Sequence, residues 1–81
     1  NDESGYGRYD LAMIPIKSNE KAYLMEFKIS KTKKGMEEKA EKALKQIDEK
    51  KYDTKLKARG IKNILKIGVA FYGKEVKVVF K

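Results

Sequence analysis

Alternating apolar and polar residues near the start of the chain predict a β-hairpin. Its second strand is expected over residues 22–30, and its first over residues 9–17, where the apolar residues are Leu11, Met13, Ile14 and Ile16. Pro15 has no N–H group to donate, so the first strand is expected to lie at a sheet edge or to contain a bulge there. Ser18 and Asn19 favour a turn between the two strands.

Helical spacing of apolar residues follows the hairpin and predicts a helix over residues 32–51. The stripe expected to be buried consists of Met36, Ala40, Ala43, Leu44 and Ile47. Lys50 and Lys51 lie in the last turn, where the helix dipole favours positive charge. A shorter helix over residues 53–59 is expected to end at Gly60, because glycine readily adopts the left-handed conformation of a helix cap.

β-Branched and aromatic residues predict two more strands, over residues 61–73 and 75–81, joined by a turn at Gly73 and Lys74. In the first of these strands, the odd-numbered positions, which share one side, include Ile61, Leu65, Ile67, Val69 and Phe71. In the second, the side chains expected to point into the core are those of Val76, Val78 and Phe80.

The resulting element order, β-β-α-α-β-β, predicts a single α/β domain with a mixed β-sheet over residues 1–81. An antiparallel hairpin, a crossover helix and a return strand require both parallel and antiparallel strand pairs in one sheet. With only 81 residues, the core of such a domain is small.

Charge and composition narrow the possible functions. The chain has 20 Lys and Arg residues against 12 Asp and Glu, a formal net charge of +8, which favours a polyanion such as nucleic acid as partner. A membrane surface and simple solubility are the alternatives, although an Ala-rich helix stripe argues against membrane anchoring. No apolar run approaches the ~20 residues of a membrane span, so a cytoplasmic protein without membrane contact is expected.

Because the chain has no Cys and no His, it cannot form disulfides, thiolate or His zinc sites, or Ser/His triads.

Three charged residues in the predicted hairpin form a candidate site for chemistry. Glu26 and Lys28 share one face of their strand because side chains alternate. A turn centred on residues 19 and 20 would place residue 10 opposite residues 28–29, with Asp10 one diagonal step from Glu26. Two carboxylates with a nearby ammonium suit a divalent cation and metal-assisted phosphodiester hydrolysis. The alternative is a cross-strand salt bridge on a half-exposed sheet.

The tripeptide Glu-x-Lys carries little weight alone, because it also occurs at residues 37–39, 49–51 and 75–77. The first two of these lie on the predicted long helix, where residues two apart do not share a face. The third lies on the last strand, where its charges are expected on the solvent side. Only Glu26 and Lys28 lie on a predicted strand between apolar residues, with an aspartate, Asp10, on the neighbouring strand of the hairpin.

The segments "GYGRYD", "YLMEFKIS" and "KALKQIDEKKY" resemble the PD-(D/E)XK nuclease superfamily, in particular the nuclease-like domain found C-terminal to AAA-ATPase-like domains. The resemblance implies a restriction-endonuclease-like fold with Mg²⁺ or Mn²⁺ as cofactor. It implies Asp10 and Glu26 as metal ligands together with the carbonyl of Phe27. It further implies Lys28 as the catalytic lysine and Gln46 as a residue near the site.

The sequence departs from the superfamily pattern at its start. The superfamily core begins with a helix and a first strand, which do not fit before Tyr9. We therefore expect a truncated C-terminal fragment of a larger protein, with an upstream AAA-ATPase-like domain, or a homodimer in which another protomer supplies the missing layer.

Basic residues beside the candidate site predict contact with nucleic acid, most simply DNA. The candidates for phosphate contact are Arg8, Lys31, Lys33 and Lys34. A solvated loop is the competing interpretation. The sequence thus leaves two functions open: a metal-dependent nuclease, or a non-catalytic module that keeps the fold and binds nucleic acid or protein.

Overall fold

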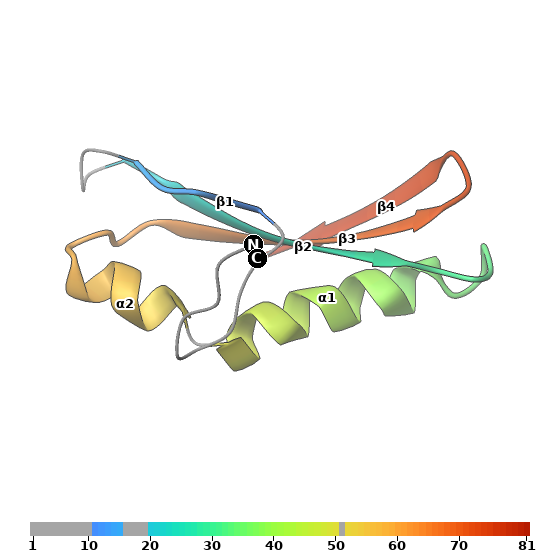
Figure 1. Cartoon of the computed structure of the whole chain (residues 1–81), viewed down its shortest axis with the longest axis horizontal. Helices are drawn as coiled ribbons and strands as arrows, with labels where there is room; N and C mark the ends of the chain where they lie inside the picture. Colours follow the sequence, from blue (N-terminus) through green and yellow to red (C-terminus); the bar gives the residue numbers. More distant parts are fainter. Residues whose placement is uncertain (1–10, 16–19, 51) are drawn as a thin grey trace.

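Four strands form one sheet in the order β1-β2-β3-β4 in a computed structural model, which describes residues 11–15, 20–50 and 52–81 (Figure 1). The elements are β1 (Leu11–Met13), β2 (Ala22–Ile29), α1 (Met36–Lys50), α2 (Tyr52–Ala58), β3 (Ile64–Tyr72) and β4 (Glu75–Phe80). This β-β-α-α-β-β order confirms the predicted one.

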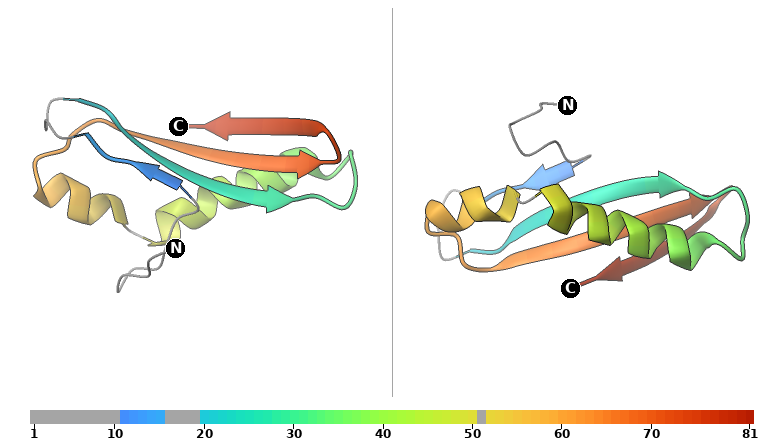
Figure 2. Two further views of the ribbon diagram at one scale, coloured as in Figure 1. Left: turned by 45° about the horizontal axis from the view of Figure 1, so that its top comes forward. Right: turned by 90° about the horizontal axis from the view of Figure 1, so that it is seen from below.

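The sheet is mixed, as predicted. β1 pairs with β2 antiparallel, β2 with β3 parallel, and β3 with β4 antiparallel. The parallel pair is joined by α1 and α2, and both helices lie on the same face of the sheet (Figure 2). In the described part of the chain, no helix has the length and apolar character needed to cross a membrane.

The core lies between the sheet and α1. All members of the predicted helix stripe are buried, namely Met36, Ala40, Ala43, Leu44 and Ile47. Ala22 and Leu24 of β2 meet this stripe from the sheet. Leu56 of α2 and Ile61, just after it, extend the core beyond the end of α1.

Gly68 in the middle of β3 brings α1 unusually close to the sheet. A Cβ atom built at this position would clash with the carbonyl oxygen of Ala40 and lie 2.7 Å from the amide nitrogen of Leu44. Both atoms belong to the helix backbone, so no side-chain rotation could make room. The helix can therefore rest on the sheet here only because residue 68 has no side chain.

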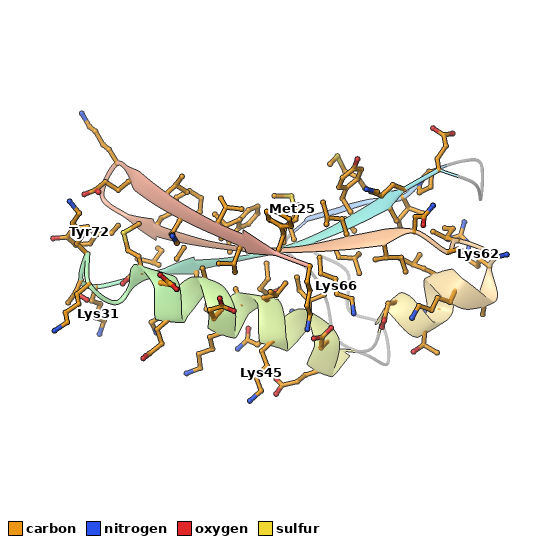
Figure 3. The ribbon with its side chains drawn as sticks, turned by 180° about the vertical axis from the view of Figure 1, so that it is seen from behind. Met25, Lys31, Lys45, Lys62, Lys66 and Tyr72 are labelled. Atoms are coloured by element: carbon orange, nitrogen blue, oxygen red, sulfur yellow. The ribbon has the colours of Figure 1, made fainter. Side chains whose placement is uncertain are left out.

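A lysine on β3 ties both helices to the sheet. Lys66 is oriented toward the helices (Figure 3), where its Nζ donates to Asp48 of α1 at 2.6 Å and to Asp53 of α2 at 3.2 Å. Hydrogen bonds from Lys66 and Lys81 hold the pKa of Asp48 below its ordinary value. Burial alone would lower the pKa of Lys66, but its bonds to both carboxylates outweigh this and raise it.

The prediction of which β4 residues point into the core is wrong. Val76, Val78 and Phe80 are 53%, 48% and 68% exposed, and Val79 is the β4 residue that packs against the core. The reason is that α1 covers the opposite face of the sheet. We call the uncovered side the open face; it also carries Met25, which points away from the helices (Figure 3).

The expected hairpin register and strand length are also wrong. Placing residue 10 opposite residues 28–29 requires Leu11 opposite residues 27–28, whereas Leu11 pairs with Met25. β1 ends at Met13, and Pro15, which cannot donate to a ladder, follows it. Met13 pairs with Tyr23, so the observed pairing is centred on position 18 of the chain and not between positions 19 and 20. β1 is nevertheless an edge strand, as Pro15 predicted.

We expect Gly68→Ala to lower the free energy of unfolding by about 1–3 kcal/mol, because the added methyl group must push α1 away from β3. Urea unfolding followed by circular dichroism measures this. The control is Gly73→Asn at the β3-β4 turn, where φ is 59° and a Cβ meets nothing within 4 Å. Asparagine tolerates this conformation, so the control should cost much less. Equal losses for the two variants would contradict the close contact.

We expect Asp48→Asn to lower the free energy of unfolding at neutral pH by about 0.5–1 kcal/mol, a modest value because Asp48 is partly exposed. Its pKa is lowered in the folded state, so its contribution is complete above the ordinary value of 3.8 and disappears as the pH falls through the folded-state pKa. Urea unfolding across this acidic range should therefore show the variant and the wild type converging. Glu41→Gln, at an exposed position of α1, is the control and should show no such convergence. A constant difference at all pH values would contradict the assignment.

Candidate functional site

Glu26 is a buried carboxylate under the end of α1. It lies in the middle of β2, on the face that the helices cover, and is 8% exposed. The Nζ of Lys50 donates to both of its carboxylate oxygens, at 2.9 Å and 3.1 Å. In the ladder Glu26 is opposite Gly68, so the close approach of α1 to the sheet also brings Lys50 within reach.

Lys28 shares the face of Glu26, as strand parity predicted, and lies about 7 Å further along β2. It is partly buried and lines a surface hollow. The other lining residues are Phe27, Ile29, Lys39 and Phe71. Two lysines and three apolar residues therefore line this hollow, and Glu26 is not among the lining residues.

The backbone of β2 fixes the direction of the Phe27 carbonyl. The N–H groups of Ala22 and Ser30 donate to carbonyls of the segment around β3, at 2.8 Å each. Backbone groups of the even-numbered residues of β2 therefore face β3, and those of odd-numbered residues face the β1 side. The carbonyl of Phe27 thus points to the β1 side of the strand.

Sequence reasoning missed Lys50, which contacts Glu26 in the structure. Its place in the last turn of α1 indicated only a favourable interaction with the helix dipole. Gln46 lies one helical turn before it and is partly buried, on the same side of α1. Since Gln46 is expected near the site, the four-residue spacing between Gln46 and Lys50 is the signal that could have identified Lys50 from the sequence.

The lysines of the β2-α1 loop lie beyond the end of β2. Lys31, Lys33 and Lys34 are exposed, and Lys33 forms an ion pair of 3.4 Å with Glu75. Side chains order the loop: the hydroxyl of Ser30 donates to the Thr32 carbonyl at 2.6 Å, and the Thr32 hydroxyl accepts from the N–H of Gly35 at 3.0 Å. Along a fully extended chain Lys31 would lie at most about 16 Å from Glu26. These lysines follow the end of β2, where a ligand that extends along the strand from Glu26 would reach them.

Two of the expected site residues, Arg8 and Asp10, lie outside the described residues. Among the residues that the structure does describe, no group of three or more His, Cys, Asp or Glu side chains could hold a metal ion. The Glu26 side chain nevertheless suits a divalent metal ion, because its carboxylate oxygens are hard ligands. It already binds one cation, the ammonium of Lys50.

Sequence comparison assigns the family. A sequence model of the PD-(D/E)XK nuclease superfamily matches residues 1–81, the whole chain, and the chain therefore belongs to this superfamily. No curated protein and no solved structure matches it. The family agrees with the resemblance in the sequence and with the mixed α/β sheet. Nucleases of this superfamily generally use divalent metal ions.

We expect Lys50→Met to lower the free energy of unfolding by about 1–3 kcal/mol in metal-free buffer, because the Glu26 carboxylate is left buried without its ammonium. The double variant Glu26→Gln/Lys50→Met should be more stable than Lys50→Met alone, since it removes the unpaired charge. Urea unfolding of the complete cycle measures the coupling. Lys45→Met, on the exposed side of α1, is the control and should change stability by less than about 0.5 kcal/mol. Additive effects of the two substitutions would contradict the pairing.

Proposed function

We propose that this chain is a metal-dependent nuclease domain that hydrolyses phosphodiester bonds of nucleic acid. The observation that carries this proposal is the buried Glu26 carboxylate, on one strand face with Lys28, in a chain of the PD-(D/E)XK nuclease superfamily. A carboxylate in such a place requires a cation, and an ammonium beside it suits a negatively charged substrate.

Asp10 is proposed as the second carboxylate of the site. Each described β1-β2 pair joins residues whose numbers add up to 36, as in Leu11 with Met25 and Ala12 with Leu24. One further pair in the same register would join Asp10 directly to Glu26, closer than the diagonal expected from the sequence. Mg²⁺ or Mn²⁺ would then bind these carboxylates and the carbonyl of Phe27, which points to the β1 side.

The bound ion would supply an activated water and polarise the phosphate. The chain's own residues would do the rest. Lys28 would neutralise the charge that grows on a non-bridging phosphate oxygen as the water oxygen attacks phosphorus and the bond to the leaving oxygen breaks. Gln46, one turn before Lys50, would help to position the attacking water or the phosphate.

DNA is the proposed substrate class. The net charge of +8 favours a polyanion. Arg8, Lys31, Lys33 and Lys34 are proposed to contact phosphates on either side of the cleaved bond. An upstream AAA-ATPase-like domain, a homodimer and a cytoplasmic location remain part of this proposal.

A second function is supported by the ion pair itself. With Lys50 on both oxygens of Glu26, the carboxylate already has a counter-ion and could serve a purely structural role. The chain would then be a non-catalytic module that binds nucleic acid or protein through its basic surface.

We expect the wild-type chain to nick supercoiled plasmid in the presence of Mg²⁺ or Mn²⁺ and not in the presence of EDTA. Glu26→Gln should lower the nicking rate by at least about a hundredfold, because the metal loses a charged ligand. Agarose gels over a time course measure the conversion. Glu38→Gln, at an exposed position of α1, is the control and should cleave like the wild type. DNA binding without nicking, independent of the metal and unchanged by Glu26→Gln, would support the non-catalytic alternative instead.

A further inference from the structure

The ammonium of Lys50 binds the carboxylate group to which the proposed metal ion would bind, that of Glu26. Its Nζ contacts both carboxylate oxygens, at 2.9 Å and 3.1 Å. The two side chains are only 22% and 10% exposed, so solvent screens their attraction weakly. A cation bound to both oxygens takes the place that a metal held by both oxygens would need.

We propose that Lys50 is a positioning residue that acts as the metal's competitor: its ammonium is the counter-ion of Glu26 in the metal-free chain and leaves when a divalent cation binds. This inference rests on the proposed function, which assigns Glu26 to the metal. Two cations within about 4 Å of each other repel strongly in a partly buried site. A buried carboxylate without any cation is also costly, so one of the two should always be present.

The location of Lys50 makes its departure feasible. It is the last residue of α1, and its flexible four-carbon stem allows the ammonium to move while the backbone stays in place. The C-terminal end of a helix also attracts positive charge, so the displaced ammonium keeps a favourable environment.

Lys66 shows the contrasting arrangement. It lies in the middle of β3 and donates to two carboxylates from two different helices, Asp48 and Asp53. Moving its ammonium would break both connections at once. Lys66 is therefore a structural residue, whereas Lys50 contacts the carboxylate of the proposed metal site from a helix end.

Competition predicts a specific and unusual result: removing Lys50 should strengthen metal binding although it weakens the metal-free fold. Titration calorimetry with MnCl₂ is the test. Lys50→Met should bind Mn²⁺ on the order of tenfold more tightly than the wild type, because the competing charge is gone. Lys45→Met removes the same charge from the exposed side of α1 and should bind like the wild type. Glu26→Gln should bind much more weakly than all of them.

Equal or weaker Mn²⁺ binding by Lys50→Met would overturn the proposal, as would full binding by Glu26→Gln. So would Mn²⁺ binding to neither the wild type nor Lys50→Met. A gain that is the same for Lys45→Met would indicate a general charge effect and would also overturn it.

A measurement on the wild type avoids any folding defect of the variant. Acetic anhydride labels accessible amines, and peptide mass spectrometry gives the rate for each lysine. Lys50 should be labelled slowly without metal and several-fold faster at saturating Mg²⁺, whereas the rate at Lys45 should not change. If labelling of Lys50 stays constant or slows, the metal and the ammonium share Glu26 and the competition is refuted.

The outcomes separate this inference from the proposed function. Plasmid nicking by the wild type, abolished by Glu26→Gln, tests the nuclease activity alone. If nicking occurs while Lys50→Met gains no affinity, the function stands and the competition fails. If Lys50→Met gains affinity but no protein nicks DNA, the competition stands and the chain is a metal-binding module without nuclease activity.

Discussion

The contact between α1 and the backbone of β3 at Gly68 determines how the rest of the molecule is arranged. A helix that rests directly on the sheet at this residue covers one face and leaves the other open. It also sets the distance between the sheet and every side chain of α1, because the helix packs as a rigid unit. The reach of Lys50 to Glu26 and of Asp48 to Lys66 both follow from that single close approach.

The covered face is consequently the charged one. Three of its ionic groups, Glu26, Lys50 and Lys66, lie between helix and sheet, whereas the apolar residues Val76, Val78 and Phe80 lie on the open face. Apolar residues, both alanines and larger side chains such as Leu24 and Ile47, fill the space between helix and sheet beside these ion pairs. The cost of burying each charge is offset by a partner, as required in a medium of low polarity.

Local patterns predicted the elements of this fold, but not which face of the sheet is covered. Helical spacing identified every buried residue of α1, because that signal depends only on the helix itself. The sequence of a strand such as β4 shows which residues share a face, but not which face a helix covers. The face with the apolar residues of β4 was therefore wrongly expected to point into the core. The register of the hairpin was wrong because it was derived from an assumed turn position, whereas Leu11 pairs with Met25. Strand parity correctly joined Glu26 and Lys28, whereas the Lys50 contact spans 24 residues and depends on packing.

The internal ion pairs also change what the net charge of +8 implies. Lys50 and Lys66 are largely buried and bound to carboxylates, so their charges are cancelled close to where they lie. Attraction of a polyanion therefore depends on exposed lysines, such as those of the β2-α1 loop, and on whatever ammonium the site itself can release. If Lys50 leaves Glu26 when a metal ion binds, the arriving ion makes that lysine available to a phosphate. Metal binding and nucleic-acid binding would then strengthen each other, since coupling between two ligands is reciprocal.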